Sequence, residues 1–358
     1  MSTLVLHDYF EALEGGGHLS QLLAQHVPAD LGYGFARPHH PLLTPLTAIK
    51  QYNLQVHSRI PLWRQFKLAR AFAQQTSFIK QYDNVIYSGF YTPLAVEQHR
   101  RGANILYCHT PPRFIYDQRA FYRRQIPAVA RPVLKAFIDY LQPRYEQAVA
   151  QMDQIIANSA NVRQRIQQYL AREAIVIYPP CDTQRFVWQG QGDYYLSMAR
   201  LDPLKRVDWI IRAFLQRPDK RLIVASGGSE YARLQQLAQG APHIELTHWL
   251  SAEQLAQLVG DAIATIYIPT EEDFGMSVVE SMAAGKPVIG VAEGGLLETI
   301  IPQHTGLLLK PPLTLAALCE AVEYLTPQRA LTMRSACEQQ AARFRTEIFL
   351  KRIREILN

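Results

Sequence analysis

Residues 269–280 read Pro-Thr-Glu-Glu-Asp-Phe-Gly-Met-Ser-Val-Val-Glu and place a glycine turn between a strand and a helix. The apolar run 262–268 that precedes this stretch is typical of a buried strand. Met276 and Val279 then begin an apolar repeat at helical spacing. The stretch therefore predicts a strand, a turn at Gly275 and a helix, which is a building unit of an α/β fold.

The same stretch predicts a binding site. A helix N-terminus presents unpaired N–H groups and the positive end of the helix dipole, and the small residues Gly275 and Ser277 let a phosphate approach them. Glu280 lies about one turn into the helix and leans toward its N-terminus, so it reaches a polyol beside that phosphate, while Glu272 faces the far side of the ligand. A sugar-bearing nucleotide diphosphate fits this arrangement. The alternative is that both glutamates are solvated carboxylates near a helix start, where acids are favoured.

The rest of the chain repeats the alternation of strand and helix in two runs. A polar, glycine-bearing segment at 188–193 between the runs has the composition of a linker. The chain therefore predicts two doubly wound α/β domains. In the first run we expect strands at 3–7, 84–87, 105–107, 154–157 and 175–177, and helices such as 18–26 and 162–170. In the second run we expect strands at 194–198, 221–225, 244–246, 263–268, 287–291 and 306–309, and helices at 207–215, 230–237, 252–258, 276–284 and 315–325.

A second candidate site follows the strand at 194–198. Arg200 lies at the strand end, and an Asp-Pro turn separates it from Lys205, so both cations can point to one place. Such a pair neutralises a diphosphate and stabilises a departing nucleotide without a metal ion. The alternative is that Arg200 pairs with Asp202 or Asp208 and that Lys205 is solvated.

Together, these residues resemble the retaining GT-B glycosyltransferases of family 4, the glycosyl transferases group 1. The family motif is a glutamate, seven residues and a second glutamate, as at Glu272 and Glu280, and the likeness continues through residues 281–295. The family also carries an arginine and a lysine at positions matching Arg200 and Lys205. This chain departs from many members by having Arg206 where they have glycine. The stretch Tyr-Cys-His-Thr-Pro at 107–111 resembles the mannosyltransferase-like branch that builds lipid-linked surface polysaccharides.

The resemblance implies an α/β GT-B fold, in which two Rossmann-like domains face each other across a cleft. Residues 1–186 would form the acceptor-binding domain and residues 187–342 the nucleotide-sugar-binding domain. Residues 343–358 would form a helix that packs back on the first domain.

The resemblance also implies roles for individual residues. Several of them have simpler alternatives: a flexible turn for the glycines at 15–17, a turn cap for His109, a plain strand-to-helix turn for Gly227 and a buried core side chain for Trp249. The implied catalytic residues are His109, Arg200, Lys205 and Glu272. The implied donor-binding and nucleotide-binding residues are Gly16, Gly17, Gly227, Trp249, Leu250, Phe274, Gly275, Met276, Ser277 and Glu280.

The expected activity is transfer of a hexose with retention, with GDP-mannose as the best guess for the donor and a lipid-linked or other saccharide, such as a polyprenyl-linked one, as the acceptor. No cofactor or metal is expected, because no Asp-x-Asp pair occurs and the two cations already supply positive charge. Two alternatives remain open. One is a UDP-sugar-dependent transferase that makes a soluble disaccharide or phosphosugar, and the other is an inactive nucleotide-sugar-binding partner of another transferase.

Composition bounds the setting of this activity. The chain has 358 residues, of which 48% are hydrophobic, and no apolar run approaches the roughly 18–20 residues of a spanning helix. It lacks a secretory signal pattern at residue 1, and its four cysteines are scattered without metal-ligand spacing. We therefore expect a cytoplasmic protein with reduced, structural thiols, with peripheral association on the inner face of the cell membrane as an open addition.

Two segments combine basic and aromatic residues, at 59–80 and 113–145. Such segments suit an anionic membrane surface, although a solvated helix face with an aromatic core side is an equal alternative. The net charge of +6 is modest and no nucleic-acid-binding motif accompanies it, so we expect no nucleic-acid partner.

Overall fold

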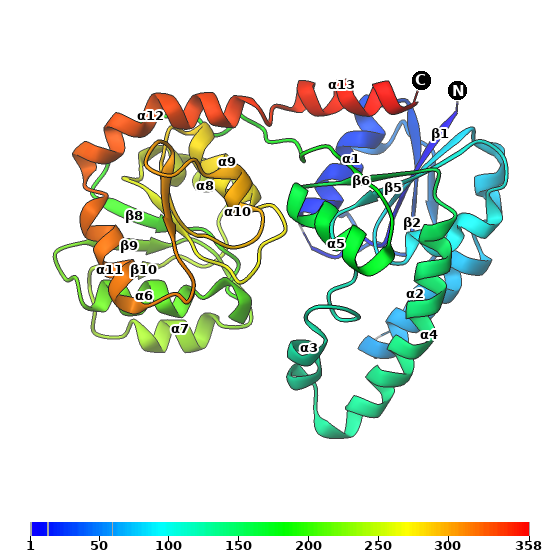
Figure 1. Cartoon of the computed structure of the whole chain (residues 1–358), viewed down its shortest axis with the longest axis horizontal. Coiled ribbons are helices and arrows are strands. Elements are labelled where there is room, and N and C mark those ends of the chain that lie inside the picture. Colours follow the sequence, from blue (N-terminus) through cyan, green and yellow to red (C-terminus); the bar gives the residue numbers. More distant parts are fainter. Residues whose placement is uncertain (1, 13, 59, 358) are drawn as a thin grey trace. The chain divides into compact units, whose positions relative to one another are not determined.

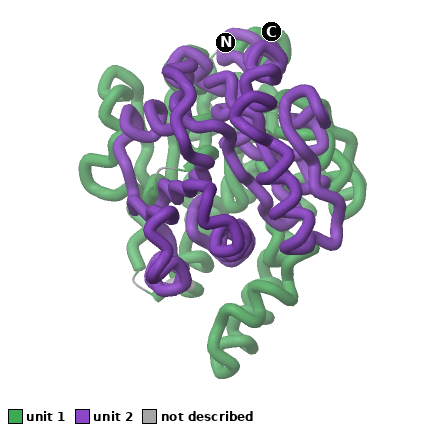
Figure 2. The backbone as a smooth tube through the Cα atoms, turned by 90° about the vertical axis from the view of Figure 1, so that its left-hand side faces the viewer, with its two compact units in different colours: residues 1–178, 350–358 green, residues 179–349 purple. Residues whose placement is uncertain are grey.

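The computed structural model of the chain describes residues 2–12, 14–58 and 60–357. It divides into two compact units, each built around its own parallel sheet (Figures 1 and 2). Unit 1 comprises Met1–Tyr178 and Leu350–Asn358, and unit 2 comprises Pro179–Phe349.

The sheet of unit 1 is seven-stranded, in the order β3-β2-β1-β4-β5-β6-β7, and all of its pairings are parallel. Because β1 pairs with both β2 and β4, the direction of winding reverses at β1. Parallel strands covered by helices on both faces are buried and apolar, as in β1. The strands are β1 (Thr3–His7), β2 (Ala29–Tyr33), β3 (Gln51–Asn53), β4 (Asn84–Ser88), β5 (Ala103–Cys108), β6 (Gln154–Ala157) and β7 (Ile175–Val176).

Helices cover both faces of this sheet (Figure 1). The α-helices are α1 (Gly15–His26), α2 (Pro61–Gln74), α3 (Arg119–Gln125), α4 (Arg131–Ala150) and α5 (Ala160–Leu170). Short 3-10 helices are η1 (Thr44–Leu46), η2 (Ser77–Gln81), η3 (Thr92–Gln98) and η4 (Ala128–Ala130).

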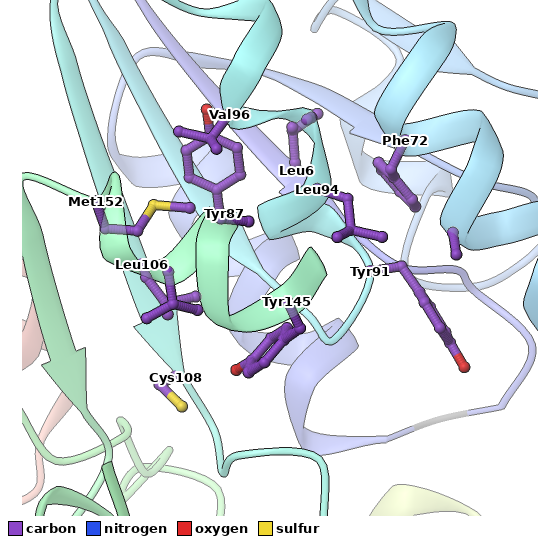
Figure 3. Packing of buried hydrophobic residues seen from close by; sticks show 14 of the residues in the cluster. Leu6, Phe72, Tyr87, Tyr91, Leu94, Val96, Leu106, Cys108, Tyr145 and Met152 are labelled. Carbon is purple, nitrogen blue, oxygen red and sulfur yellow. The ribbon is translucent and has the colours of Figure 1, made fainter. Parts of the chain in front are cut away.

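The core of unit 1 lies between the sheet and helices α2 and α4. Figure 3 shows Tyr87 and Leu106 from the sheet near Tyr145 of α4, with Phe72 of α2 in the same cluster. The aromatic residues of the two basic-aromatic segments therefore differ in burial. Phe72 and Phe137 are buried in this core, which is the core-side arrangement considered above, whereas Trp63 and Tyr122 are exposed.

The sheet of unit 2 is six-stranded, in the order β10-β9-β8-β11-β12-β13, and is again parallel. Its strands are β8 (Tyr194–Ser197), β9 (Arg221–Val224), β10 (Ile244–Leu246), β11 (Thr265–Tyr267), β12 (Val288–Val291) and β13 (Gly306–Leu309). Its helices are η5 (Pro203–Lys205), α6 (Val207–Leu215), α7 (Tyr231–Leu237), α8 (Ala252–Asp261), α9 (Met276–Ala283), α10 (Leu296–Thr299), α11 (Leu315–Tyr324) and α12 (Pro327–Ala342).

The two units meet along the sequence at Tyr178 and Pro179, whereas the sequence placed this boundary after residue 186. Residues 179–186 belong to unit 2 because they pack there. The N–H of Cys181 donates to the carbonyl oxygen of Phe344 at 2.7 Å, and Phe186 is part of the apolar core of unit 2.

Helix α13 (Thr346–Leu357) begins in unit 2 and ends in unit 1. Its residues Leu350 and Ile353 are buried, and the guanidinium of Arg354 donates to the carbonyl oxygen of His26 at 3.0 Å. The last residues of the chain are therefore an integral part of unit 1.

Within the described residues, no helix is both long enough and apolar enough to cross a bilayer.

Candidate functional site

Several predicted residues of unit 2 lie in loops at the carboxyl ends of its parallel strands, and Met276, Ser277 and Glu280 lie on helix α9. Arg200 follows β8, Gly227 follows β9 and Glu272 follows β11, and the loop after β12 carries Gly294. The strand order reverses between β8 and β11, and open α/β sheets bind ligands in the crevice at such a reversal. The sequence motifs and the sheet topology therefore place the candidate site at the same location, the carboxyl ends of the strands of unit 2.

Lys205 and Glu272 form a direct ion pair at this edge. Lys205 Nζ lies 2.5 Å from Glu272 Oε2 and donates to the hydroxyl oxygen of Tyr267 at 3.0 Å. The hydroxyl of Tyr267 in turn donates to Glu272 Oε2 at 2.8 Å. The side chains of Lys205 and Glu272 are only about one fifth exposed, so neither is a solvated surface charge as the alternatives supposed.

The electrostatics of this triangle favour its charged form. Burial disfavours a protonated lysine, but the Tyr267 hydroxyl and the Glu272 carboxylate outweigh that effect and raise the pKa of Lys205 above its ordinary value. Burial and the neighbouring carboxylate also raise the pKa of Tyr267, which keeps its hydroxyl protonated as a donor. The sequence did not single out Tyr267, because it ends an apolar run that is otherwise a buried strand.

The loop that carries Glu272 is held from two sides. The N–H of Thr270 donates to the carbonyl oxygen of Leu204 at 2.7 Å, and the N–H of Gly295 donates to the carbonyl oxygen of Glu272 at 2.8 Å. Gly294 lies so close that a Cβ atom there would come within 2.2 Å of the Glu272 carbonyl oxygen, and its φ of +58° is in the left-handed region. Close packing against the loop therefore accounts for the glycine pair.

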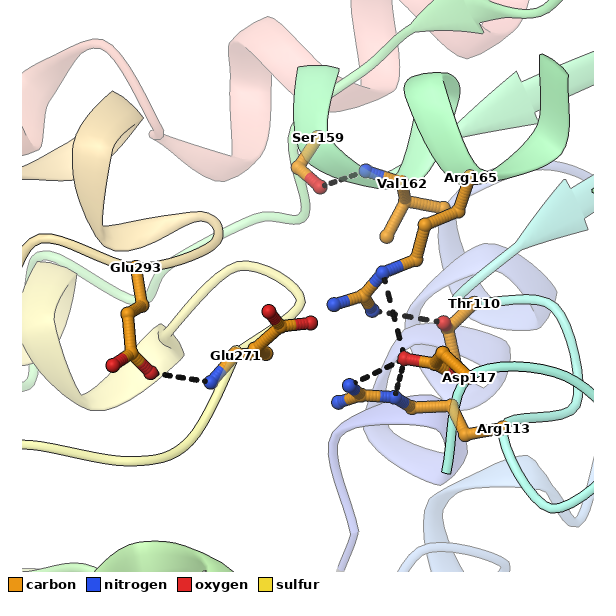
Figure 4. A network of polar contacts seen from close by, with 8 residues as sticks. All are labelled: Thr110, Arg113, Asp117, Ser159, Val162, Arg165, Glu271 and Glu293. Atoms are coloured by element: carbon orange, nitrogen blue, oxygen red, sulfur yellow. Dashed lines mark hydrogen bonds and ion pairs between the residues drawn. The ribbon is translucent and has the colours of Figure 1, made fainter. Parts of the chain in front are cut away.

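Arg206 supports the same loop through Glu293. Its guanidinium lies 3.3 Å from Glu293 Oε2, and that oxygen accepts the backbone N–H of Glu271 at 3.2 Å, a contact drawn in Figure 4. Arg206 has a φ of +51°, the left-handed conformation that glycine adopts without strain. The departure from glycine noted in the sequence therefore costs backbone strain and adds a charged support next to Glu272.

Replacing Arg206 with glycine should change the free energy of unfolding little, because the lost ion pair is offset by about 1 kcal/mol of relieved strain. The rate of the sugar transfer expected from the sequence should fall about five-fold, since contacting charged groups couple by roughly 1 kcal/mol. Steady-state kinetics of Arg206→Gly, Glu293→Gln and the double variant check this. The two single variants should lose the same factor in rate, and the double variant should lose no more than either of them. Wild-type kinetics for Arg206→Gly would show that the guanidinium does not position the loop.

Glu280 lies on α9 and has a perturbed pKa. Helix α9 follows Gly275, whose φ of +90° makes the turn predicted from the sequence, and Met276 and Ser277 begin its first turn. Burial of the Glu280 carboxylate raises its pKa to about 7, although the positive charge of Arg185 offsets part of this rise. Glu280 makes no side-chain hydrogen bond or ion pair with the described residues, so a ligand hydroxyl could satisfy its oxygens. Phe274 is buried instead and packs edge-on against Phe344, so its side chain belongs to the core.

Trp249 and Gly227 are in direct contact on the neighbouring loops. A Cβ atom on Gly227 would come within 2.4 Å of Trp249 Nε1, so only glycine lets the indole ring lie there. Trp249 is 59% exposed, which excludes the alternative that it is a core residue, while Leu250 is half-buried. Arg200 is exposed in the loop after β8, where the N–H of Leu201 donates to the carbonyl oxygen of Gly227.

In unit 1 the structure brings Gly16 next to His109. A Cβ atom on Gly16 would lie 3.4 Å from His109 Nε2, and that nitrogen is 2.9 Å from the hydroxyl oxygen of Ser88. Gly16 and Gly17 are in the first turn of α1, so they are helical residues and not the flexible turn of the alternative. Gly17 is buried, and its lack of a side chain leaves room for Leu42.

Both histidines of this cluster are neutral near pH 7. Burial lowers the pKa of His109 to about 3 and that of His7 to about 4. His7 Nδ1 lies 2.8 Å from the carbonyl oxygen of Ser88, and since a carbonyl oxygen only accepts, Nδ1 carries the proton. A neutral, half-buried imidazole at the carboxyl end of β5 therefore serves as a hydrogen-bonding group and not as a positive charge.

A polar cluster follows the same end of the sheet of unit 1 (Figure 4). Arg113 Nη2 lies 2.7 Å from Asp117 Oδ2, and the buried Arg165 of α5 approaches the same oxygen at 3.9 Å and donates to Thr110 Oγ1 at 3.4 Å. The Ser159 side chain accepts the N–H of Val162 and so caps α5. This cluster fixes the segment after His109.

Among the residues that the structure describes, no three His, Cys, Asp or Glu side chains lie together as a metal-binding group. All four cysteines are buried. The expectation that no metal takes part stays a prediction.

Comparisons with known proteins agree with this architecture. Residues 182–344 match the family model described as glycosyl transferases group 1. The alpha-1,3/1,6-mannosyltransferase of Mus musculus is 25% identical over 247 residues, which are 59% of this chain and 57% of that protein. The chain spans about half the length of the curated relatives it matches.

Solved structures resemble the chain over nearly its whole length. The sucrose-phosphate synthase of Thermosynechococcus elongatus superposes with a TM-score of 0.77 at 17% identity, covering 99% of this chain and 98% of that one. The Anabaena protein HepE, solved in complex with UDP-glucose, superposes with a TM-score of 0.77 at 17% identity, covering 100% and 99%. At these identities the likeness concerns the fold. This chain therefore has the GT-B fold, and its residues 182–344 match the glycosyl transferases group 1 family model.

Proposed function

We propose that the protein is a retaining, metal-independent glycosyltransferase that moves a hexose from a nucleotide diphosphate sugar to a saccharide acceptor. The observation that carries the proposal is the Lys205, Glu272 and Tyr267 triangle beside the first turn of α9. A buried cation, a carboxylate and a helix N-terminus at one strand edge match a ligand that has both phosphate and hydroxyl groups. Glu280 adds a second carboxyl group on the same helix.

In the proposed reaction, the bond between the anomeric carbon of the sugar and the diphosphate oxygen breaks, and a bond to the acceptor oxygen forms on the same face. The acceptor proton passes to the departing diphosphate oxygen, so the products are the glycoside and the protonated nucleoside diphosphate. Arg200 and Lys205 stabilise the charge that develops on the diphosphate. Glu272 holds the sugar hydroxyls, Glu280 the ribose hydroxyls, and the neutral imidazole of His109 a further sugar oxygen.

GDP-mannose is the proposed donor, and a lipid-linked saccharide is the proposed acceptor. The support is the 107–113 stretch together with relatives named as mannosyltransferases, one of which is a GDP-Man:Man(3)GlcNAc(2)-PP-Dol mannosyltransferase. A UDP-sugar is the second candidate, favoured by the likeness to proteins named as sucrose-phosphate synthase and solved with UDP-glucose. An inactive binding partner is less favoured, because Lys205 and Glu272 are both present and already paired.

A thermal-shift panel of nucleotide sugars should separate these candidates. We expect GDP-mannose to raise the melting temperature more than UDP-glucose, because a ligand that binds only the native state stabilises it more, at equal concentration, the tighter it binds. Glu280→Gln is the matched control and should lose most of the shift. A larger shift with UDP-sugars would favour the second candidate, and an inverted product anomer seen by NMR would contradict the retaining mechanism.

A further inference from the structure

One segment of unit 1 projects away from its sheet and buries none of its side chains. Residues 119–133 comprise α3, η4 and the start of α4, and both views show them extending beyond the rest of the unit (Figures 1 and 2). No residue in this range is buried. We refer to residues 119–133, together with the exposed Lys135, as the arm, since Leu134 between them is buried in the core of unit 1.

The tip of the arm is apolar. Val129 is 88% exposed, Val133 is 55% exposed and Tyr122 is 38% exposed. Single exposed apolar side chains are common on protein surfaces, but these three share one projecting segment, whose Ile126 packs partly against the core of unit 1.

The flanks of the arm are basic. Arg119, Arg123, Arg124 and Lys135 are exposed, and the sequence from 118 to 138 contains no acidic residue. Asp139, the next acid along the chain, lies 2.6 Å from Lys135 in an exposed pair that water screens. The arm therefore carries a net positive charge beside its apolar tip.

Helix α2 adds a second exposed apolar group beside α4. Ile60 is 65% exposed and Trp63 is 50% exposed at the start of this helix. The ring of Trp63 stacks on Phe66 with centroids 5.4 Å apart, and Phe66 contacts Tyr140 of α4 at 4.9 Å. Tryptophan is the residue that prefers the boundary between acyl chains and lipid headgroups.

We propose that the arm, together with Ile60 and Trp63, docks on an anionic membrane surface. The valines and Trp63 enter the boundary between headgroups and acyl chains, and the arginines contact lipid phosphates. Charge complementarity selects an anionic surface, and the exposed valines favour a bilayer over a nucleic acid, which offers phosphates but no apolar layer. This inference goes beyond the proposed function, because it concerns where the protein binds and not which sugar it transfers.

Flotation of the full chain with vesicles tests the proposal without donor or acceptor, so its failure and the failure of the proposed function are distinguishable. We expect binding to vesicles that contain phosphatidylglycerol, weakening as salt is raised, and little binding to phosphatidylcholine alone. Arg123→Gln with Arg124→Gln should weaken binding about 25-fold, which corresponds to about 1 kcal/mol for each basic residue. Val129→Ser with Val133→Ser should also weaken binding, and the loss should persist at high salt.

Matched controls come from unit 2. Leu331 on α12 is 47% exposed, and Arg217 and Arg221 are basic residues outside the arm. Leu331→Ser, and Arg217→Gln with Arg221→Gln, should bind vesicles as the wild type does, and circular dichroism should show all variants folded. Equal binding to both vesicle types, or arm variants that bind as tightly as the controls, would overturn the proposal. Binding of a duplex oligonucleotide that competes with the vesicles and depends only on the arginines would replace the membrane with a nucleic acid.

Discussion

Replacing Lys205 with alanine should lower the rate of glycosyl transfer by about a hundred- to a thousand-fold, the usual cost of removing one preorganised electrostatic group. In the structure Lys205 Nζ contacts both Glu272 Oε2 and the hydroxyl oxygen of Tyr267. Without the lysine, Glu272 loses a cationic partner, and its negative charge then faces the departing diphosphate of the proposed reaction. The transition state thus loses a stabilising cation.

Steady-state kinetics at saturating donor measure this loss. The effect should appear in kcat, because the charge on the diphosphate develops during bond breaking. Lys220→Ala is the matched control. Lys220 immediately precedes β9 and therefore lies at the amino ends of the strands, away from the candidate site at their carboxyl ends. An unchanged kcat in Lys205→Ala, with a folded protein confirmed by circular dichroism, would remove Lys205 from the mechanism.

Replacing Glu280 with glutamine should stabilise the unliganded protein at neutral and alkaline pH by about 2 to 3 kcal/mol. Burial raises the pKa of Glu280 from its ordinary value of 4.5 to about 7. Because the folded state disfavours the carboxylate, the destabilisation is absent below the unfolded pKa of 4.5, grows as the pH rises to about 7 and is constant above it. Glutamine carries no charge, so the variant escapes this penalty.

Denaturant unfolding of wild type and Glu280→Gln at a series of pH values checks the sign and the window. The difference in unfolding free energy should be small near pH 4 and should reach its plateau near pH 7 or above. Glu253→Gln is the control of opposite sign, because hydrogen bonds at the start of α8 lower the pKa of Glu253 and its contribution is lost as the pH falls. A difference for Glu280→Gln that does not vary with pH would contradict the perturbed carboxyl group.

The same variant should bind the donor less well, because an amide nitrogen replaces one of the two oxygens that we propose accept ligand hydroxyls. Glu280 would then destabilise the unliganded fold while strengthening donor binding. Such a combination is characteristic of a ligand site and not of a core position.

Local signals were enough to locate the turn at Gly275 and helix α9 from the sequence. A glycine with φ of +90° follows an apolar strand there and precedes an apolar repeat, and each of these features is visible in the residue order. Helix α6 was placed at its observed bounds for the same reason, since its apolar residues keep helical spacing. The stretches that decide the fold are therefore locally consistent.

The contacts that shape the candidate site are not local, and the sequence predicted fewer of them. Arg206 reaches Glu293, and Tyr267 reaches Lys205, only because the loops after β8, β11 and β12 are neighbours at one sheet edge. Lys205 was expected to act on phosphate beside Arg200, and its pairing with Glu272 could not be deduced from their separation along the chain.

Several elements were missed for more ordinary reasons. Strand β3 (Gln51–Asn53) is too short and polar to show a pattern, and α4 (Arg131–Ala150) contains Pro143, which normally argues against a helix. Helix α12 (Pro327–Ala342) did carry a sequence signal, a threonine cap at Thr326 followed by proline at the first helical position. This pair of residues is enough to predict the start of the helix.

The return of α13 to unit 1 makes that unit discontinuous along the chain. Leu350 and Ile353 are buried only when the final residues have joined the unit that residues 1–178 begin. During synthesis the ribosome therefore releases all of unit 2 before unit 1 receives its last helix, and a fragment ending at Tyr178 would expose the apolar surface that this helix covers. Residues 1–178 are therefore made before unit 2, but their unit is completed after it.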